Sequence, residues 1–554
     1  MPDRHTRVRL LAAAALVAAI LAIGAYAWSG QRPGGARTSA GPPPRFLDVT
    51  AGSGVRHTYD DPSAVAVGGG VAVLDCNDDG RPDLYLAGGE QPAALYRNES
   101  ATGGSVAFTP VPDPLLDRVA VNGAYPIDID GDGHVDLVVL RNGGNALLRG
   151  LGDCRFEDAT QAWGLDAGSR HTEAFSATWE RGSSWPTLAF GNYQDPAITD
   201  PAAWCEPNAL VRPSPTGTGF AAAIPLTPSW CALSMLFSDW DGSGRMDLRV
   251  SNDAHYYPPD KGEEQLWRIE PGVAPRLYGR ADGWAQVQVE GMGIGSYDLT
   301  GDGLPEVFLT SQAANRLQTL TAGASQPTYG DIGLKHGVNV AHPVIGPDQA
   351  LPSTAWHAQF EDVNDDGFVD LFVSKGNVGE QPDYATHDPS NLLLGQPDGT
   401  FRDAAEVAGI IVFDRGRGAA LVDLNLDGRL DLVEAFLGAP ARIWQNAGPA
   451  GDTQDAHWLA LRVEQPGPNV DAIGAWLEVD TGGAVQRREL TIGGGHAGGQ
   501  LGWVHVGLGA ATEARVRVRW PDGTAGAWQT VAADEFFILD RAKGDIVRWA
   551  PPGV

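Results

Sequence analysis

The chain has 554 residues and a formal net charge of −30, with 69 Asp and Glu against 39 Lys and Arg. A chain of this length exceeds the usual limit of one hydrophobic core, so we expect several domains or a closed repeat architecture. The acidic excess argues against nucleic acid as a partner, because like charges repel. Abundant glycine, short strand patterns and few long helical patterns indicate an all-β protein.

Residues 1–28 have the pattern of an export signal. Three arginines stand near the start, at Arg4, Arg7 and Arg9. An apolar run from Leu10 to Ala25 follows, and the small residues Ala25 and Ala27 fit a cleavage site. The run lies at the border between a cleaved signal and a membrane anchor, and both alternatives leave the body outside the cytoplasm. We expect a secreted, periplasmic or cell-surface protein with a Pro/Gly-rich linker over residues 29–44.

An oxygen-rich loop recurs six times after the linker. Each copy has Asp, Asn, Ser or Thr at positions 1, 3 and 5, Gly at position 6, and Asp or Glu at position 9. The candidate metal ligands at positions 1, 3, 5 and 9 are Asp75, Asn77, Asp79 and Asp83; Asp128, Asp130, Asp132 and Asp136; Asp239, Asp241, Ser243 and Asp247; Asp298, Thr300, Asp302 and Glu306; Asp362, Asn364, Asp366 and Asp370; and Asp423, Asn425, Asp427 and Asp431.

This spacing is typical of a calcium-binding loop. Ca²⁺ takes about six to eight oxygen ligands, and alternate positions on a tight turn direct side chains 1, 3 and 5 toward one point. The main-chain carbonyl of position 7 and the acid at position 9 would complete the shell, while Gly at position 6 permits the sharp reversal. One copy alone fits an ordinary solvated Asp-Gly or Asn-Gly turn as well. Six copies that all keep the acid at position 9, which a turn does not require, predict up to six structural Ca²⁺ ions.

The loops begin at residues 75, 128, 239, 298, 362 and 423, so most of them are about 60 residues apart. One gap is nearly twice as long, and it predicts a degraded unit at residues 179–187 that has lost its metal ligands. Each unit carries four short strands, which is typical of a propeller blade. The sequence therefore predicts a seven-bladed β-propeller over residues 45–450, in which the strand at Phe46 completes the last blade.

Residues 451–554 show a different pattern, with alternating strands separated by Gly and Asp-Gly turns. The expected strands cover residues 458–463, 475–479, 485–492, 503–506, 516–520 and 536–539. This pattern predicts a small antiparallel β-sandwich or barrel as a second domain.

Four cysteines, Cys76, Cys154, Cys205 and Cys231, allow three pairings in an exported chain. We expect Cys205 to pair with Cys231, because this bond would close the irregular segment between them. Cys76 stands at position 2 of the first loop, where a side chain points away from the ion, so we expect a small packing residue there. No C-x-x-C motif occurs, which argues against zinc or thioredoxin-like chemistry.

Common catalytic motifs are absent from the sequence, including H-E-x-x-H, G-x-S-x-G and the P-loop. Residues 493–498 match G-x-G-x-x-G by letters, but a strand pattern follows instead of a helix, so we expect a tight turn. We therefore assign no catalytic residue. The alternative is a calcium-dependent cyclase, lyase or isomerase that uses the central funnel, lined by His255–Tyr257 or by Trp356 and His357.

The loops resemble FG-GAP and VCBS repeats, and the tail resembles the ASPIC and UnbV domain. The tail motifs that carry the second resemblance are His457-Trp458-Leu459, residues 471–475, Gly493-Gly494-Gly495, residues 506–509 and residues 518–523. The combination is that of the cartilage acidic protein family and its bacterial homologues. The resemblance implies a secreted or membrane-anchored calcium-binding propeller, often of unassigned activity. Residues 179–187, Ser243, Thr300 and Glu306 depart from the pattern, so the third and fourth loops are the weakest calcium sites.

The function we expect is that of an extracytoplasmic recognition or adhesion module with structural calcium in its blades. Its ligand would be a glycan or a protein, and its membrane contact would be the N-terminal anchor alone. The six loops hold 19 of the acids, so bound calcium would offset much of the net charge. Repulsion between these carboxylates should destabilise the metal-free fold.

Overall fold

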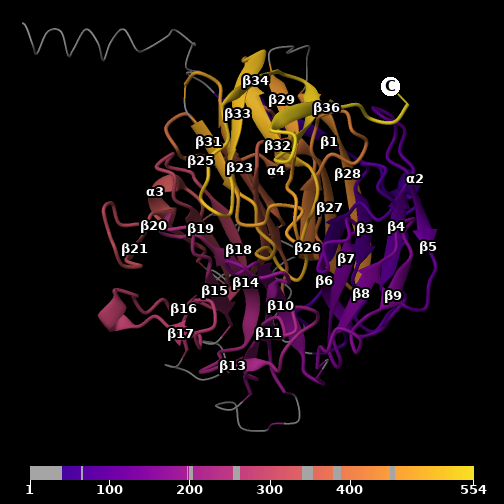
Figure 1. Ribbon diagram of the computed structural model, residues 1–554. Helices are drawn as coiled ribbons and strands as arrows, with labels where there is room; N and C mark the ends of the chain where they lie inside the picture. The colour runs from indigo at the N-terminus through magenta and orange to yellow at the C-terminus, as the bar shows by residue number, and fades with distance from the viewer. Residues whose placement is uncertain are drawn as a thin grey trace, which may run out of the picture.

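The computed structural model describes residues 40–553, except residues 64–65, 167, 196–197, 199–203, 254–261, 313, 340–353, 379–388, 450–455 and 484. The predicted signal or anchor at residues 1–28 and the candidate residues His255–Tyr257 lie outside this part of the chain. Within the described residues, no helix is both long enough and apolar enough to cross a membrane. The described chain forms a ring of sheets and a second β-domain that sits on one face of the ring (Figure 1).

Seven four-stranded antiparallel sheets are formed by the described residues up to Pro449, and we call them blades 1 to 7. Blades 1 to 3 contain β2 (Val71–Leu74), β3 (Asp83–Leu86), β4 (Ala94–Asn98) and β5 (Phe108–Val111); β6 (Val121–Ile127), β7 (Asp136–Arg141), β8 (Ala146–Gly150) and β9 (Phe156–Asp158); and β10 (Thr172–Thr178), β11 (Thr187–Asn192), β12 (Asn208–Val211) and β13 (Ile224–Leu226). Blades 4 to 6 contain β14 (Ala232–Ser238), β15 (Asp247–Asn252), β16 (Gln265–Arg268) and β17 (Arg276–Leu277); β18 (Gly291–Tyr297), β19 (Glu306–Ser311), β20 (Arg316–Leu320) and β21 (Tyr329–Asp331); and β22 (Ala355–Glu361), β23 (Asp370–Lys375), β24 (Asn391–Gly395) and β25 (Phe401–Asp403). Blade 7 contains β26 (Arg415–Val422), β27 (Asp431–Leu437), β28 (Ala439–Pro449) and β1 (Pro44–Asp48).

The first strands of the blades line the axis of the ring. These strands are β2, β6, β10, β14, β18, β22 and β26, and each contacts the next, with β26 returning to β2. Every residue of β6, β10 and β14 is buried, because each inner strand has a blade packed against both of its faces. The closed arrangement of antiparallel sheets confirms the predicted all-β propeller fold.

The strand β1 closes the ring. Its Phe46 pairs with Asn446 and its Asp48 pairs with Trp444, so the first described strand of the chain is the outer strand of the last blade. This pairing confirms the predicted role of the strand at Phe46. Short helical turns follow the outer strands of blades 7, 4, 5 and 6, namely α2 (Thr50–Ser53), η2 (Arg280–Asp282), α3 (Gly333–His336) and α4 (Ala405–Ala408).

Apolar side chains from neighbouring blades form the core of the ring. Tyr85 and Leu137 belong to a cluster shared by blades 1 and 2, and Phe372 and Trp444 belong to one shared by blades 6 and 7. Successive residues of a strand point to opposite faces of its sheet, so each blade contributes to two such clusters. The hydrophobic stabilisation is therefore spread around the ring.

The C-terminal domain is a sandwich of two four-stranded sheets, with strand orders β32-β29-β35-β36 and β31-β30-β33-β34. Its strands are β29 (His457–Glu464), β30 (Trp476–Asp480), β31 (Val485–Glu489), β32 (Val504–Gly509), β33 (Glu513–Arg519), β34 (Gln529–Ala532), β35 (Glu535–Asp540) and β36 (Asp545–Trp549). Side chains such as Leu461, Leu477, Val516 and Phe537 pack between the two sheets.

Two features of this sandwich differ from the predicted antiparallel domain. The strands β29 and β35 run parallel, because the chain visits the other sheet before it returns beside β29. The sequence also does not predict β34 and β36. Both are short edge strands with few buried residues, so they lack the alternation of apolar and polar side chains that marks a strand.

The segment between β31 and β32 leaves the sandwich and enters the axis of the ring. It makes main-chain bridges to the inner strands of blades 1 to 5 through Ile492, Gly493, Gly495, Gly498 and Gln500. His496 in this segment is fully buried, and its Nε2 donates a hydrogen bond to the carbonyl oxygen of Val67 at 2.5 Å. Its ring lies 4.9 Å from that of Trp356, centroid to centroid. We call residues 492–500 the axial segment.

Close main-chain packing explains the glycines of the axial segment. A Cβ on Gly498 would lie 2.1 Å from the carbonyl oxygen of Val71, and a Cβ on Gly123 would lie 1.8 Å from that of Ala497. Neither position has room for a side chain. The glycines at 493–498 thus do more than form the expected turn, since they let the second domain reach the inner strands of the first.

Candidate metal centre

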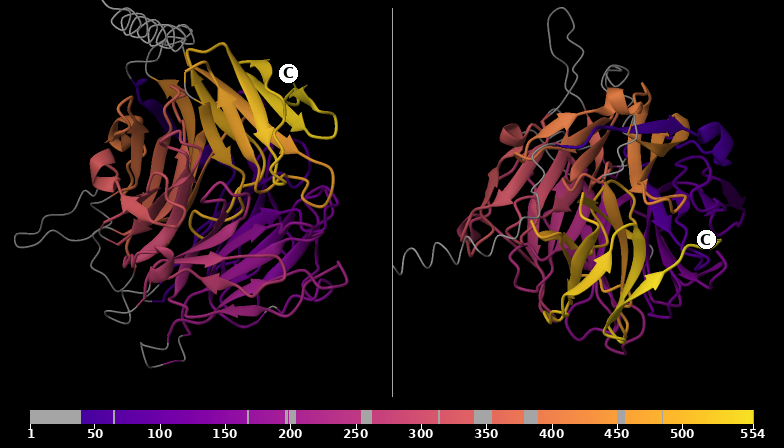
Figure 2. Two further views of the ribbon diagram at one scale, coloured as in Figure 1. Left: turned by 60° about the vertical axis from the view of Figure 1, so that its left-hand side comes forward. Right: turned by 90° about the horizontal axis from the view of Figure 1, so that it is seen from above.

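The six oxygen-rich loops connect the first and second strands of blades 1, 2, 4, 5, 6 and 7. We name each loop after its blade. Because the loops occupy the same place in every blade, they gather at one end of the ring, where the sandwich sits (Figure 2). Blade 3 has the predicted degraded hairpin at the equivalent place, between β10 and β11.

Glycine at position 6 and the acid at position 1 hold every loop in the same turn. The glycines have φ between 78° and 89°, a left-handed conformation that strains other residues, and they are Gly80, Gly133, Gly244, Gly303, Gly367 and Gly428. In every loop the carboxylate at position 1 accepts the N–H of this glycine, at 2.6–3.0 Å. The predicted position 1 ligands therefore all face the inside of their turns.

The acids at position 5 also shape the turn. Each accepts the main-chain N–H two residues later, and they are Asp79, Asp132, Asp302, Asp366 and Asp427. Blade 4 has Ser243 at this position. Asp side chains make the same bond in ordinary solvated turns, so this contact does not distinguish a metal site from a turn.

The acid at position 9 has a structural role that is not evident from the sequence. In blade 1, Asp83 Oδ2 accepts the N–H of Cys76 at 2.8 Å, and its Oδ1 accepts the N–H of Asn98 at 2.7 Å. The position 9 acids of blades 2, 6 and 7 make the same pair of bonds, and they are Asp136, Asp370 and Asp431. The expectation that the turn does not require this acid is wrong, because the acid joins the loop to the third strand. A carboxylate has about four lone-pair sites, so about two remain for a cation.

Four side-chain oxygens at position 3 are buried and have no hydrogen-bond partner within the described part of the chain. They are the Oδ1 atoms of Asn77, Asp130, Asn364 and Asn425. Asn425 is 1% exposed, and its Nδ2 donates to the carbonyl oxygen of Gly104 at 2.8 Å, which fixes the orientation of the amide. Leaving a buried acceptor without a donor costs about 1–3 kcal/mol. A bound cation would satisfy these oxygens.

Burial and mutual repulsion disfavour the charged form of the loop carboxylates. Burial, together with a smaller effect of neighbouring carboxylates, raises the pKa of Asp75 to about 6, of Asp423 to about 7 and of Asp83 to about 8. Burial and then the charge of Asp366 raise the pKa of Asp362 well above its usual range. A divalent cation among the carboxylates would favour their ionised form.

Blade 2 brings three of its four predicted ligands together. Carboxylate oxygens of Asp128, Asp130 and Asp136 lie within 4.8 Å of one another. Asp132 turns toward Arg149 instead, with Nη2 2.7 Å from Asp132 Oδ2, and the Nε of the same arginine is 2.7 Å from Asp130 Oδ2. The position 5 acids of blades 1 and 7 pair with arginines as well, Arg81 and Arg429. These pairs are partly exposed and contribute little to stability.

Blade 4 uses its position 9 acid in a different way. Asp247 accepts five hydrogen bonds, two from Arg245 and one each from the Trp240 indole, the Tyr278 hydroxyl and the main chain of Ile269. The donor-to-acceptor distances are 2.8–3.0 Å. Since a carboxylate has about four lone-pair sites, this predicted ligand is saturated by protein donors.

Blade 5 has Glu306 at position 9, and the longer side chain reaches back into its own loop. Its Oε2 accepts the N–H of Leu299 at 2.8 Å and that of Thr300 at 3.0 Å. Its Oε1 accepts the hydroxyls of Thr319 at 2.7 Å and of Thr300 at 3.3 Å. The hydroxyl of Thr300, a predicted ligand, is thus hydrogen-bonded to the acid that was expected to share a metal with it.

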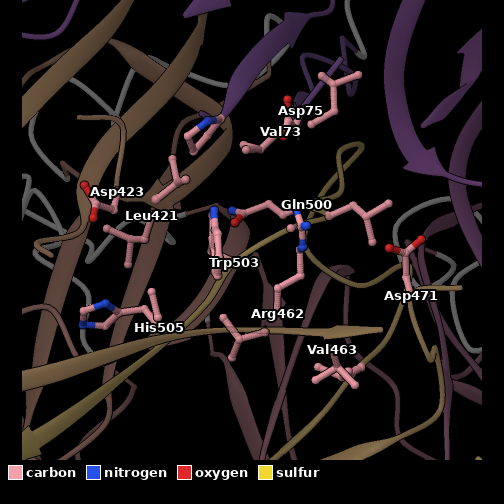
Figure 3. A pocket seen from close by; sticks show the side chains of 18 of the residues that line it. Val73, Asp75, Leu421, Asp423, Arg462, Val463, Asp471, Gln500, Trp503 and His505 are labelled. Atoms are coloured by element: carbon pink, nitrogen blue, oxygen red, sulfur yellow. The ribbon is translucent and has the colours of Figure 1, made fainter. Parts of the chain in front are cut away.

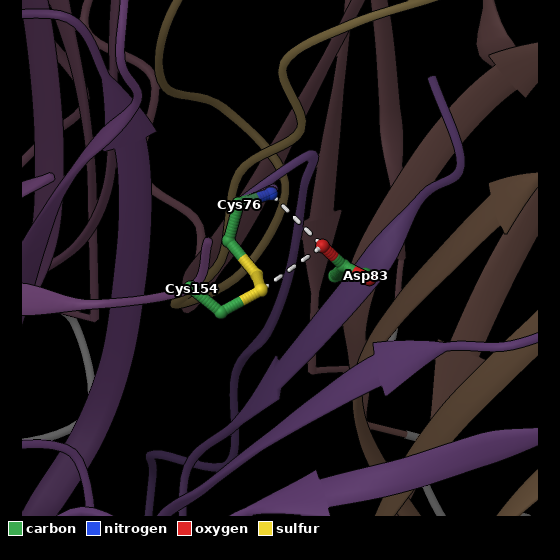
Figure 4. A group of neighbouring side chains, drawn as sticks. All are labelled: Cys76, Asp83 and Cys154. Carbon is green, nitrogen blue, oxygen red and sulfur yellow. Dashed lines mark hydrogen bonds between the residues drawn. A yellow bond between two sulfur atoms is a disulfide. The ribbon is translucent and has the colours of Figure 1, made fainter. Parts of the chain in front are cut away.

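Two disulfides are present in the ring. Cys205 is bonded to Cys231, as predicted. Cys76 packs in the buried cluster shared by blades 1 and 2, as predicted, and it is also bonded to Cys154. Cys154 lies in the β8–β9 turn of blade 2, and a contact between residues 78 apart leaves no signal in the spacing. Figure 4 shows the bond beside Asp83, whose Oδ2 is 3.9 Å from Cys154 Sγ, so the disulfide ties the blade 1 loop to blade 2.

Tryptophans of the sandwich pack directly on two of the loops. A Cβ on Gly428 would lie 1.9 Å from the ring of Trp458, and a Cβ on Gly80 would lie 2.2 Å from the ring of Trp549. The indole Nε1 of Trp503 donates to the carbonyl oxygen of Gly80 at 3.0 Å. Position 6 of blades 1 and 7 is therefore both a turn position and a docking point for the second domain.

Polar contacts join the sandwich to the loops of blades 4, 5 and 6. The three pairs are Glu489 with the main-chain N–H of Asp239, Arg487 with the carboxylate of Asp298, and His505 with the carboxylate of Asp365. Their distances are 2.7, 3.4 and 2.6 Å, respectively. The loop end of the ring is thus also the interface between the two domains.

A cavity of about 160 Å³ remains between the sandwich and the loops of blades 1 and 7. Asp75 and Asp423 line it from the propeller, and Asp471 lines it from the sandwich. Figure 3 shows Arg462 beside Trp503 in this space, and the guanidinium carbon lies 5.4 Å from the centre of the indole. The position 1 acids of two loops therefore border the domain interface.

The fold is an all-β propeller followed by a β-sandwich, and two known families match parts of it. The FG-GAP-like repeat family matches residues 75–139 and 362–434, and the ASPIC and UnbV family matches residues 465–545. These matches confirm both resemblances that the sequence indicates. The first covers the loops of blades 1, 2, 6 and 7, and the second covers most of the sandwich.

Curated relatives of this chain include cartilage acidic protein 1 from two vertebrates. The protein from Xenopus tropicalis is 31% identical over 93 residues, which are 17% of this chain and 14% of that protein. The protein from Homo sapiens is 33% identical over 81 residues, which are 14% of this chain and 12% of that protein. The similarity thus spans about one seventh of each relative.

Solved structures with a similar chain path are more distant. BBS1N in complex with ARL6DN has a TM-score of 0.40 and 10% identity, over 73% of this chain and 98% of that one. An Agrocybe aegerita lectin that recognises terminal N-acetylglucosamine has a TM-score of 0.35 and 16% identity, over 66% of this chain and 88% of that one. The Dos1 propeller has a TM-score of 0.30 and 10% identity, over 74% of this chain and 96% of that one. We draw no functional conclusion from likenesses this low.

Proposed function

We propose that this protein is an extracytoplasmic recognition or adhesion module whose propeller holds structural Ca²⁺ in its blade loops. The observation that carries the calcium assignment is the set of buried position 3 oxygens that have no hydrogen-bond donor among the described residues. Each of these oxygens shares its loop with a position 9 carboxylate that is fully buried. All the available ligands are oxygens, which is the ligand type that Ca²⁺ prefers.

A bound ion would act as a cross-link within its loop. Side-chain oxygens at positions 1, 3, 5 and 9 and the carbonyl oxygen at position 7 would surround it. The ion would remove the repulsion between the carboxylates and stabilise the folded state over the unfolded state, which has no preformed site. Because Trp458 and Trp549 rest on two of the loops, a rigid loop would also fix the position of the sandwich.

Recognition rather than catalysis is supported by the contents of the ring axis. The axial segment bridges to the inner strands of five blades, so at the sandwich end it takes the space that a substrate would need. His357, one of the candidate funnel residues, is 5% exposed, and its Nδ1 accepts the N–H of His496 at 3.2 Å. His357 therefore belongs to the junction between the domains. We propose a glycan or a protein as the ligand, and the fold itself does not choose between them.

The test is ligand binding by the exported chain, measured on glycan and matrix-protein arrays in millimolar Ca²⁺ and in excess EDTA. We expect binding to one ligand class that is lost in EDTA, together with a lower melting temperature in EDTA. At ten to one hundred times Kd, each ion stabilises the fold by about 1.4–2.7 kcal/mol. Calcium-dependent turnover of a small metabolite would favour the alternative enzyme, and an EDTA-treated protein with unchanged melting and binding would contradict the calcium assignment.

A further inference from the structure

We infer that calcium binding is confined to the contiguous blades 6, 7, 1 and 2, and that blades 3, 4 and 5 replace the ion with hydrogen bonds and protein cations. This inference rests on the proposed calcium function and assigns it to particular loops. It changes the expected stoichiometry from six ions to four. It also divides the ring into a calcium-dependent part, which includes the closing blade, and a calcium-independent part.

The state of the position 3 oxygen separates the two groups of loops. In blades 1, 2, 6 and 7 this oxygen is buried and has no donor among the described residues, at Asn77, Asp130, Asn364 and Asn425. In blade 4 the position 3 carboxylate of Asp241 accepts the N–H of Ser243 and lies 3.6 Å from Arg245. In blade 5 the hydroxyl of Thr300 is bonded to Glu306. In blades 4 and 5 the buried oxygen without a donor among the described residues is instead at position 1, Oδ1 of Asp239 and of Asp298. An unsatisfied oxygen at position 3 thus marks four loops of the six, and the other two differ further because protein donors saturate their position 9 acids.

Blade 4 contains its own cation. The guanidinium of Arg245, at position 7 of the loop, donates from Nε to Asp247 Oδ1 at 2.9 Å and from Nη2 to Asp247 Oδ2 at 3.0 Å. The same guanidinium lies 3.6 Å from Asp241, so it stands between the position 3 and position 9 acids. The indole of Trp240 and the hydroxyl of Tyr278 fill the remaining lone pairs of Asp247. A fixed positive charge therefore does here what Ca²⁺ would do elsewhere.

Blade 5 replaces the ion mainly with hydrogen bonds. Glu306 is one methylene longer than Asp, and its two oxygens are taken by two main-chain N–H groups and two threonine hydroxyls. The position 1 acid, Asp298, is 3.4 Å from Arg487 of the sandwich, which also donates to the carbonyl oxygen of Gly301 at 3.0 Å. An arginine of the second domain thus supplies positive charge beside this loop.

Blade 3 shows the end point of the same replacement. Glu180, at position 2 of the degraded hairpin, accepts the hydroxyl of Thr187 at 2.8 Å and the Nε of Arg212 at 2.6 Å. Arg212 also donates to the carbonyl oxygens of Glu270 and Val273 in the next blade, at 2.8 and 2.6 Å. An ion pair joins the hairpin to the third strand here, as the position 9 acid does in the other blades.

The family comparison divides the ring at the same places. The FG-GAP-like repeat match covers residues 75–139 and 362–434, which hold the loops of blades 1, 2, 6 and 7, and leaves out the loops of blades 4 and 5. This division comes from the sequence pattern alone, whereas the unsatisfied oxygens come from the geometry. The position 3 oxygens and the family match select the same four loops. Because β26 of blade 7 contacts β2 of blade 1, these four blades are continuous around the ring.

The arrangement predicts where the ring loosens when calcium is removed. Blade 7 is closed by the N-terminal strand β1, and blades 7 and 1 hold the docking points of Trp458 and Trp549. Loss of calcium should therefore weaken ring closure and sandwich docking together. The hydrogen bonds of blades 3, 4 and 5 do not involve a metal, so these blades should keep their structure.

The first test is the calcium content of the purified full chain, equilibrated with millimolar Ca²⁺ and measured by elemental analysis. We expect four ions per chain. Any other whole number of ions, such as five or six, would overturn the assignment to blades 6, 7, 1 and 2 while leaving the proposed calcium function intact. No stoichiometric calcium would overturn the proposed function as well, so the two failures are distinguishable.

Matched position 3 variants identify the loops. Asn77→Leu and Asn425→Leu should each reduce the content from four ions to three, whereas Asp241→Leu in blade 4 should leave four. Loss of an ion in Asp241→Leu would overturn the assignment.

Hydrogen exchange of the unmodified chain gives a readout that does not depend on any variant. We expect EDTA to increase exchange in β3, β4, β23 and β27 and to leave β11, β15 and β19 unchanged, and a uniform increase around the ring would contradict the division.

Discussion

Nε2 of His505, on strand β32 of the sandwich, donates a hydrogen bond to Oδ1 of Asp365 at 2.6 Å, and Asp365 is position 4 of the blade 6 loop. Both side chains are buried. Burial by itself would lower the pKa of His505, but the charge and hydrogen bond of Asp365, together with the charges of Glu361 and Asp423, raise this pKa overall. A residue between two predicted metal ligands is thus bonded to the other domain, which couples the shape of the loop to the position of the sandwich.

We predict that His505→Ala destabilises the protein by about 3–5 kcal/mol, because it leaves Asp365 buried without its partner. The measurement is the free energy of unfolding in urea. Asp365→Asn combined with His505→Ala should lose less than the sum of the two single losses, since the pair acts as a unit. Additive losses would show that the contact carries no coupling between the domains.

Docking of the sandwich should depend on the absence of a side chain at Gly428. The change Gly428→Ala would place a Cβ 1.9 Å from the ring of Trp458, so we expect a lower melting temperature and easier proteolysis between the domains. Gly133→Ala is the matched control, because Gly133 has φ of +89° against +85° for Gly428 but nothing within 4 Å of its Cβ position. The two variants share the backbone strain, and equal effects would show that contact with Trp458 contributes nothing.

The metal-free protein should lose stability as the pH rises. Burial raises the pKa of Asp423 to about 7 and that of Asp83 to about 8, whereas an unfolded Asp has a pKa of about 3.9. Between about pH 4 and pH 8 these two carboxyl groups hold more protons in the folded state than in the unfolded state. Their protonation therefore stabilises the fold fully below about pH 4, and this stabilisation disappears as the pH passes about 8. We expect EDTA-treated protein to melt at a lower temperature at pH 8 than at about pH 5.5. Calcium requires ionised carboxylates, so added calcium should raise the melting temperature more at pH 8. A metal-free melting temperature that is independent of pH would contradict this account.

The two disulfides should differ in their effect on stability. The Cys76–Cys154 bond closes 78 residues and the Cys205–Cys231 bond closes 26. In the chain-entropy description the longer loop gains about 1 kcal/mol more, so the double serine variant of Cys76 and Cys154 should lose about that much more than the variant of the other pair. Unfolding in urea measures the free energy of unfolding of both variants, and each measurement is repeated in reductant as a control. A larger loss for the pair at 205 and 231 would indicate that native contacts rather than loop closure dominate.

Local patterns in the sequence are sufficient to predict the propeller. The strand before each loop, the glycine at position 6 and the strand after it lie within about a dozen residues, so each hairpin is encoded in one stretch. The strand at Phe46 follows the same pattern as the other outer strands, and it does close blade 7. The pairing of Cys205 with Cys231 is also local, although the segment that the bond encloses contains β12 and β13 of blade 3 and is not the irregular segment that the sequence predicts.

Contacts between distant parts of the chain account for what the sequence does not predict. The position 9 role of Asp83 depends on the register of the third strand, where Asn98 supplies the second N–H. The axial segment packs Gly498 on Val71, more than four hundred residues earlier in the chain, and only its run of glycines hints at close main-chain approach. The saturation of Asp247 depends on Tyr278, which directly follows β17, the outer strand of the same blade.

The central claim is that calcium, not water, occupies the loops at the unsatisfied position 3 oxygens. A crystal structure of the calcium-equilibrated protein, with anomalous data, tests this claim most directly. We predict an ion about 2.3–2.6 Å from Oδ1 of Asn77, Asp130, Asn364 and Asn425, and no ion in the loops of blades 4 and 5. Water at hydrogen-bond distance from all four oxygens, with no anomalous signal, would contradict the account.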